Sequence, residues 1–298
     1  MGLFCIYVLP GISDSWLLVP ITTPAKDSGI NAAFIFAFFV LTSSVFFAYA
    51  SLPIYQVLEG YRLPSYVRNR LRNRHLRKFH RLKAVERRFR STNQLPRGVT
   101  TDDLRLRYPV DAGSVRATRL GNALTSMESW SATRYHLDSQ TMWHELQAIS
   151  SDNVRKDTDE GRAPVDFFVS SIVHMFLLSS SAFLVGLFTP HKQALVIGVL
   201  ATVTIPVSYR LAVNNTLDWA QSVKAMVNVG RSELASGLGL QLPGTLEGER
   251  QMWSAHFHAV ELNNDHHIAS YNSFRVPSPE ASKANRTVWR GLRNVFHS

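Results

Sequence analysis

The sequence predicts an all-α integral membrane protein with three transmembrane helices and a helical cytoplasmic module. Three observations lead to this fold class: three long apolar segments without charge, a dense basic segment directly after the first of them, and little strand-like alternation in the rest. The 298 residues carry a net charge of +10, 45% are hydrophobic and only one is cysteine. This composition excludes a disordered chain and a disulfide framework.

The first apolar segment lies between Asp27 and Glu59, which bracket 31 residues without a charged side chain. Because a helix needs about 20 residues to span the hydrocarbon core of a bilayer, we expect a transmembrane helix at 29–58. Residues 1–28 are then an extracytoplasmic N-terminal segment. Aromatic side chains typical of a membrane interface follow the apolar centre: Tyr49, Tyr55 and Tyr61.

The second and third apolar segments form a predicted membrane hairpin. They occupy 166–189 and 193–213, and Thr189, Pro190 and His191 break the helical pattern between them. The third segment has only 17 uncharged residues, which is near the lower limit for a crossing, so a re-entrant hairpin is the alternative.

The positive charge is concentrated in a juxtamembrane arm at 59–92. Between Arg62 and Arg90 there are twelve basic residues and one acidic residue, a net charge of +11, so the remaining chain, with 20 basic and 21 acidic residues, is nearly neutral. Basic segments beside membrane spans stay in the cytoplasm. We therefore expect a multi-pass membrane protein with its N-terminus outside and its C-terminus in the cytoplasm.

The arm has the spacing of an amphipathic helix, because Leu76, Phe79, Leu82, Val85 and Phe89 recur every three or four residues. Such a helix binds anionic lipid headgroups, and lipid is favoured over nucleic acid because no zinc finger or RNA-recognition motif accompanies it. A solvated helix that only fixes the orientation is the plainer alternative. The predicted lipid-surface contacts are Arg68, Arg70, Arg72, Arg74, Arg77, Lys78, Arg81, Lys83, Arg87 and Arg88.

The cytoplasmic region at 93–165 is predicted to hold two helices joined by a turn. The first runs towards Trp130, the second contains Trp143, and Asp138 or Ser139 is placed to cap the second.

The second cytoplasmic region, at 214–274, begins as a continuation of the third span, which we expect to end near Gly237 or Gly239. A shorter helix then starts near Leu246, with acidic residues in its first turn. Residues 275–298 form a tail.

Four stretches resemble a group of uncharacterised bacterial multi-pass membrane proteins. They are LEGYRLP at 58–64, RATRLGNAL at 116–124, RYHLDSQTMW at 134–143 and LGLQLPGTLEGERQMW at 238–253. Their counterparts in the group are a TRLGN stretch, an RYGLD-like turn before a tryptophan, and an LGLPLP segment before an acidic helix. His136 stands where the group has Gly, and Gln241 stands where it has Pro. The resemblance implies the topology and a bacterial inner membrane, and it implies no activity.

No catalytic, cofactor or metal site is predicted. The sequence has no GxSxG elbow, Walker loop or GxGxxG fingerprint. The best metal candidate is the histidine-rich run from His256 to His267, which includes His258, Glu261 and Asp265. This run lacks an HExxH spacing, so polar surface histidines are the favoured interpretation.

Two polar features remain as candidate sites. His174 lies inside the second span with Ser170 and Ser171, and an ionisable group at that depth often has a role. The favoured interpretation is structural: a neutral histidine bonded to a serine across the helix pair, with the serines at a closely packed interface.

The TRLGN stretch is the second candidate. It offers Arg119 and Asn122 to an anion or a lipid headgroup. A structural use is equally supported, with Thr118 as a helix cap, Arg119 paired with an acid and Gly121 allowing close packing.

The function expected from these features is that of a non-enzymatic, membrane-anchored scaffold or interaction protein. It would present its helical cytoplasmic module to an unidentified protein partner and form a homo-oligomer through the serine-rich second span. The alternative is a transport or pore component lined by the second and third spans, which His174, the serines and Pro206 suggest.

Overall fold

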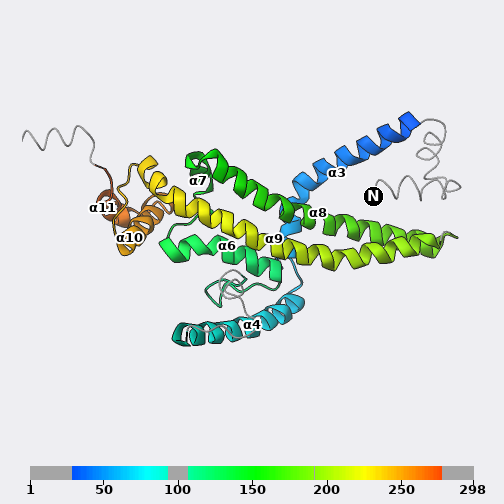
Figure 1. Ribbon diagram of the computed structural model, residues 1–298, viewed down its shortest axis with the longest axis horizontal. Helices are drawn as coiled ribbons and strands as arrows, with labels where there is room; N and C mark the ends of the chain where they lie inside the picture. Colours follow the sequence, from blue (N-terminus) through cyan, green and yellow to red (C-terminus); the bar gives the residue numbers. More distant parts are fainter. Residues whose placement is uncertain (1–28, 93–106, 191, 277–298) are drawn as a thin grey trace, which may run out of the picture. The chain divides into compact units, whose positions relative to one another are not determined.

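The computed structural model describes residues 29–92, 107–190 and 192–276, and its elements are helical. The long helices are α3 (Gly29–Leu58), α4 (Ser65–Thr92), α6 (Arg119–Tyr135), α8 (Asp152–Phe188) and α9 (Gln193–Gly237) (Figure 1). The short elements are α7 (Trp143–Ile149), α10 (Leu246–His256), a π-helical turn (Phe257–Glu261), a 3-10 turn (Asp265–His267) and α11 (Ile268–Asn272). Within these described ranges there is no strand beyond one isolated bridge between Leu240 and Arg275, which confirms the all-α prediction.

The chain divides into two compact units. The first comprises Met1–Ser126 and Asp157–Ser222, and the second comprises Met127–Lys156 and Val223–Ser298. The predicted N-terminal segment at 1–28 and residues 277–298 of the predicted tail lie outside the described residues.

Two helices, α8 and α9, are long and apolar enough to cross a membrane. The third predicted span, 193–213, falls within α9, and the second, 166–189, falls within α8 except for Thr189. α3 is a helix of 30 residues without a charged side chain, as the sequence predicts, but a membrane crossing by α3 stays a prediction, and so does the three-span topology.

Both hairpin helices extend beyond the predicted spans. α8 begins at Asp152, because residues 152–165 continue the helix through Pro164 instead of ending it there. An i,i+4 ion pair between Arg162 and Asp166, 3.1 Å long, bridges this proline. α9 ends at Gly237, which confirms the predicted end of the continuation after the third span.

The apolar parts of α8 and α9 run side by side (Figure 1), and small side chains lie between them. The Ser179 hydroxyl lies 3.1 Å from the Gly198 carbonyl oxygen and 2.6 Å from the Thr202 hydroxyl. Small residues at the contact let two helix backbones approach closely in an apolar environment. Gly186 is also buried in α8, and a Cβ on it would lie 2.6 Å from the Leu195 side chain of α9.

Two glycines allow the end of α3 to meet the start of α6. Gly60 has a φ of +92°, and a Cβ there would lie 2.9 Å from the Ala117 Cβ. A Cβ on Gly121 would lie only 2.3 Å from the carbonyl oxygen of Glu59. Side chains larger than hydrogen would force this junction apart, so the predicted close-packing role of Gly121 is confirmed.

The end of α6 is a left-handed turn at His136. This residue has a φ of +61°, and its N–H donates to the Ala132 carbonyl at 3.0 Å. Such a conformation after the last helical residue usually belongs to glycine, because a Cβ makes it costly.

Asp138 and Ser139, the predicted caps of α7, form their hydrogen bonds in the turn before that helix. Asp138 Oδ1 accepts hydrogen bonds from the N–H groups of Gln140 and Thr141, whereas Ser139 lies 2.8 Å from the Ser131 hydroxyl. α7 itself begins after Met142 without a side-chain cap. Because the Asp138 carboxylate closes this tight turn, it does not cap the first turn of α7.

The second unit has an apolar core that joins two of the motif stretches. Trp253 and Met252 from 238–253 and Tyr135 and Leu137 from 134–143 are buried in one cluster. Further buried members come from α7 and the late part of α9, including Leu146, Met226, Val227 and Leu234. α10 begins at Leu246, as the sequence predicts, and the Thr245 side chain caps it.

Candidate functional site

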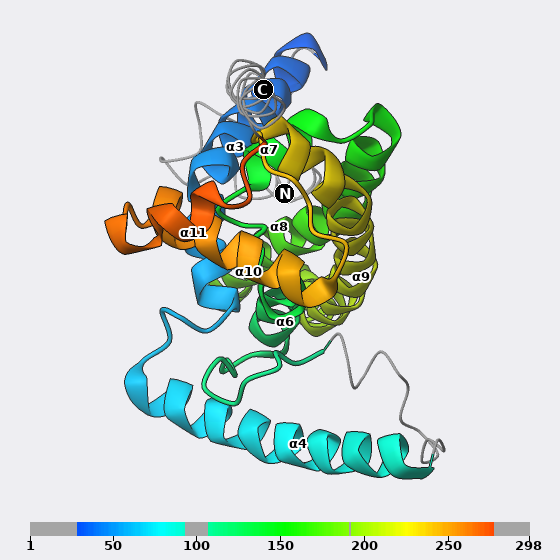
Figure 2. The same ribbon diagram turned by 90° about the vertical axis from the view of Figure 1, so that its left-hand side faces the viewer.

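Helix α4 is a fixed part of the first unit. The Arg72 guanidinium donates to two carbonyl oxygens of the segment after residue 107, those of Val115 and Gly113, each at 2.9 Å. Phe79 is buried against Tyr108 and Val115 of the same segment. Figure 2 shows α4 as one long helix with this segment beside it. The predicted basic helix is therefore confirmed, but part of its apolar face is covered by the protein's own chain.

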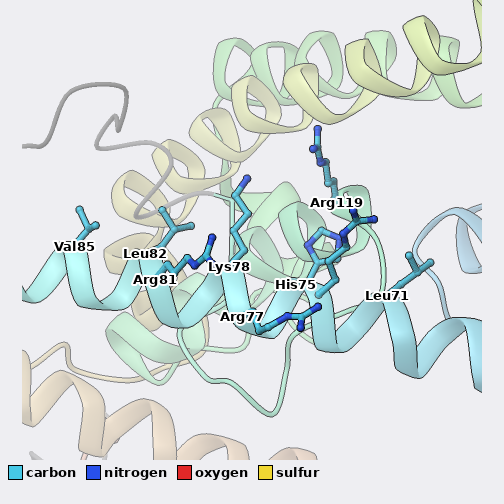
Figure 3. A pocket seen from close by; sticks show the side chains of 9 residues that line it. Leu71, His75, Arg77, Lys78, Arg81, Leu82, Val85 and Arg119 are labelled. Atoms are coloured by element: carbon cyan, nitrogen blue, oxygen red, sulfur yellow. The ribbon is translucent and has the colours of Figure 1, made fainter.

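A pocket of about 790 Å³ lies along α4 (Figure 3), and we call it the α4 pocket. Eight of its nine lining residues belong to α4, and the ninth, Arg119, comes from the first turn of α6. None of the nine is acidic. The full lining is Leu71, Arg74, His75, Arg77, Lys78, Arg81, Leu82, Val85 and Arg119.

His75 stands at the centre of this positive charge. Its Nδ1 lies 2.8 Å from the Tyr108 hydroxyl. Burial, and then the nearby charges of Arg119, Lys78 and Arg74, lower the pKa of His75 from 6.5 to about 4. Burial likewise raises the pKa of the Tyr108 hydroxyl to about 12. Both groups are therefore neutral at pH 7, and the positive charge of the pocket comes from arginine and lysine.

The ten predicted lipid-contact residues fall into three groups. Two are half-buried and engaged with the protein: Arg72 through the carbonyls described above, and Lys83 through a 3.0 Å ion pair with Glu86. Four others, Arg74, Arg77, Lys78 and Arg81, line the α4 pocket. The remainder, Arg68, Arg70, Arg87 and Arg88, are exposed. Of these, Arg68 donates to the Tyr61 carbonyl at 3.4 Å and Arg70 to the Tyr66 hydroxyl at 3.3 Å. Their contact with lipid stays a prediction.

The TRLGN stretch separates into a structural part and a pocket part. Asn122 is fully buried, accepting from the Arg116 N–H at 2.9 Å and donating to the Thr118 carbonyl at 2.6 Å. Thr118 caps α6 by accepting from the Gly121 N–H at 3.0 Å, as predicted. Asn122 is thus committed to the fold and is not offered to an anion.

Arg119 differs from the predicted pairing with an acid. No ion pair joins its guanidinium to an acidic side chain among the described residues, and it lines the α4 pocket instead. Its backbone N–H is bonded to the Tyr209 hydroxyl at 3.1 Å, which fixes the first turn of α6 on α9. The basic neighbours of Arg119 belong to a helix 40 residues earlier, and the local sequence around TRLGN gives no sign of them.

The predicted intramembrane polar site forms bonds along α8. His174 Nδ1 lies 2.8 Å from the Ser170 carbonyl oxygen, one turn earlier, and the Ser171 hydroxyl donates to the Phe167 carbonyl. Ser179 is the serine of the second span whose hydroxyl bonds across the helix pair, to the Gly198 carbonyl and the Thr202 hydroxyl. The bond from His174 to the Ser170 carbonyl thus runs within α8, and a bond from His174 to a serine across the helix pair stays a prediction.

The histidine-rich run does not assemble as a metal cluster. Among the residues that the structure describes, no group of three or more His, Cys, Asp or Glu side chains is placed to hold a metal ion. His256 is buried, 4.0 Å from Glu261, and its burial lowers its pKa. His258 stacks on His267 with ring centroids 4.6 Å apart. The prediction that these are surface histidines is wrong for His256.

A buried ionic cluster in the second unit was missed by the sequence reasoning. Arg231 Nε lies 3.0 Å from Glu249 Oε1, and the Arg231 guanidinium also covers the Tyr135 ring at 4.6 Å. The Tyr135 hydroxyl donates to Asn228 Oδ1 at 2.7 Å. Arg231 and Glu249 are 18 residues apart on different helices, so no local sequence spacing indicates that they pair.

No protein-family model, curated protein or solved structure matches this chain. The features of the chain that bear most directly on its function are the α4 pocket and the apolar helices α8 and α9.

Proposed function

We propose that this chain is a non-enzymatic, membrane-anchored interaction protein. In this proposal α3, α8 and α9 cross the inner membrane, α4 rests on the anionic cytoplasmic surface, and the second unit presents a helical surface to a protein partner. The proposed N-terminus is outside and the C-terminus is in the cytoplasm.

The observation that carries the proposal is the fixed attachment of α4 close to the end of an apolar helix. Only six residues separate Leu58, the last residue of α3, from Ser65, the first of α4. Arg72 and Phe79 hold α4 on the segment at 107–117, so its exposed cations are presented by one rigid helix. A rigid helix rich in exposed cations beside a span is suited to an anionic membrane surface.

The expected strength of this contact is substantial. A basic residue near an anionic leaflet contributes about 1 kcal/mol. The exposed cations of α4 include Arg70, Arg87 and Arg88 as well as those of the α4 pocket. Even a few of them would favour the surface-bound position of α4 by several kcal/mol.

Exposed apolar side chains on the hairpin support the membrane part of the proposal. Phe188 is 81% exposed and Phe167 is 65% exposed, and both lie on α8. On α9, Val196, Leu200 and Val203 are similarly exposed. Large apolar side chains exposed along a whole helix face are unfavourable in water and favourable in lipid.

Lipid composition tests the surface contact. The full chain would be placed in phosphatidylcholine nanodiscs with and without phosphatidylglycerol, and amide hydrogen exchange of residues 65–92 would be measured. We expect slower exchange in the anionic discs, and an R70E/R87E/R88E variant should lose most of this difference. R275E, which changes one exposed charge in the second unit, is the control. Equal exchange in both lipids would refute the surface contact.

The partner is tested at the second unit. A photo-crosslinking amino acid at Gln251 on α10 or at Glu233 on α9, both exposed, should give a discrete adduct with another protein in cells. The same probe at Phe188 should give none. An adduct of twice the chain's mass would identify the partner as a second copy. Identical adduct patterns at all three positions would contradict a docking role for the second unit.

A further inference from the structure

The α4 pocket has an excess of positive charge that nothing around it balances among the described residues. Arg74, Lys78 and Arg119 lie close enough to His75 to lower its pKa, and none of the three forms an ion pair with a described acidic side chain. Figure 3 shows Lys78 and His75 on the α4 side of the pocket and Arg119 on the α6 side. Like charges gathered around one space repel, and an anion placed there would relieve that repulsion.

The geometry of the donors suits a phosphate group. Arginine guanidinium presents parallel N–H groups that match the oxygens of phosphate, and lysine adds a compact charge. His75 supplies a third kind of donor. When the Tyr108 hydroxyl donates to Nδ1, the neutral ring carries its proton on Nε2 and can donate it to the ligand.

The rest of the lining suits a lipid. Leu71, Leu82 and Val85 are half-buried and follow the same face of α4 as His75 and Lys78. Free phosphate has no apolar surface that could pack against these side chains. A phospholipid has a glycerol and the first part of its acyl chains next to its phosphate. Charge and apolar surface therefore select the same ligand.

We propose that the α4 pocket binds the phosphate of one anionic phospholipid headgroup, between the cations of α4 and Arg119. The proposal rests on the membrane location in the proposed function, and it goes beyond a general attraction between α4 and the bilayer. It assigns a single site, and it assigns a role to Arg119, which a diffuse surface contact would not need.

The test uses the full chain in a neutral detergent. Dihexanoyl phosphatidic acid, dihexanoyl phosphatidylcholine and inorganic phosphate would each be titrated into wild type, Arg119→Gln and Arg87→Gln by calorimetry. Arg87→Gln is the matched control, because it removes one exposed charge from α4 outside the pocket. The backbone bond from Arg119 to Tyr209 does not involve the substituted side chain.

We expect one saturable phosphatidic acid site in the wild type. Arg119→Gln should weaken it by about tenfold or more, as loss of a charge-assisted hydrogen bond does, and Arg87→Gln by no more than about twofold. Phosphatidylcholine and inorganic phosphate should each bind at least about tenfold more weakly.

Three results would overturn the proposal: no saturable binding of phosphatidic acid, equal affinities in the two variants, or phosphate binding as tightly as the lipid. Circular dichroism would check folding, and if Arg119→Gln unfolds, Lys78→Gln replaces it with the same expectation. The nanodisc exchange experiment separates the two claims. Lipid-dependent protection that persists in Arg119→Gln, together with unchanged phosphatidic acid affinity, would refute the site and leave the surface contact standing.

Discussion

The left-handed turn at His136 yields a sharp test of the structure. His136 is exposed, has a φ of +61°, and uses its backbone N–H to close α6 on Ala132. His136→Gly removes the Cβ that makes this conformation costly and keeps the backbone bond.

The magnitude follows from two opposing contributions. Holding an L-residue in the left-handed region costs about 1–2 kcal/mol, and the greater freedom of glycine in the unfolded chain offsets about 0.4–1 kcal/mol of the gain. We expect a net stabilisation of about 0.8 kcal/mol, or a rise in Tm of about 2 °C.

The assay is thermal unfolding of the full chain in detergent, followed by circular dichroism. His136→Ala is the control, because it removes the imidazole but keeps the Cβ, and it should leave Tm nearly unchanged. If His136→Gly lowers Tm, or if the Ala and Gly variants shift it equally, the left-handed turn is not what limits stability at this position and the reasoning fails.

Three further predictions concern the junction, the ionic cluster and the pocket. Gly121→Ala should destabilise the first unit by about 1–3 kcal/mol, because its Cβ would lie 2.3 Å from the Glu59 carbonyl oxygen; an unchanged Tm would contradict this contact. Glu249→Ala should cost about 2 kcal/mol, because Arg231 stays partly buried without its partner, and denaturant unfolding should show that Glu249→Ala with Arg231→Met costs less than Glu249→Ala alone. The His75 imidazole should remain neutral until the pH approaches 4. Because the unfolded chain takes up that proton near pH 6.5, the contribution of His75 to stability is complete above 6.5 and is lost as the pH falls towards 4; a histidine NMR signal titrating near 6.5 instead would show that His75 is not buried among cations.

Helix positions were predictable because their signals are local. The end of α9 at Gly237, the start of α10 at Leu246 and the helix through 76–89 all follow from spacing and caps within a few residues. The extension of α8 to Asp152 was not predicted, because a proline such as Pro164 usually marks the boundary of a helix. In the structure the helix continues through Pro164, and the ion pair between Arg162 and Asp166 spans it.

The candidate site was predictable only in part. The basic residues of α4 are evident in the sequence. The bond from Arg72 to Val115 and the position of Arg119 near His75 are not, because these pairs are 43 and 44 residues apart. Asn122 and Arg119 are three residues apart in one motif, yet Asn122 is buried in the core and Arg119 lines the α4 pocket. Local chemistry does not distinguish them, since both are polar residues at the start of the same helix.

Sidedness tests the central claim, that α4 lies on the cytoplasmic face beside membrane-spanning helices. In a Cys5→Ser background, single cysteines at Ala84 on α4 and at Lys192 between α8 and α9 would be treated with a membrane-impermeant maleimide in intact spheroplasts and in inside-out vesicles. The account predicts that the Ala84 position reacts only in inside-out vesicles and the Lys192 position only in spheroplasts. Reaction of the Ala84 position in intact spheroplasts, or of both positions from the same side, would contradict it.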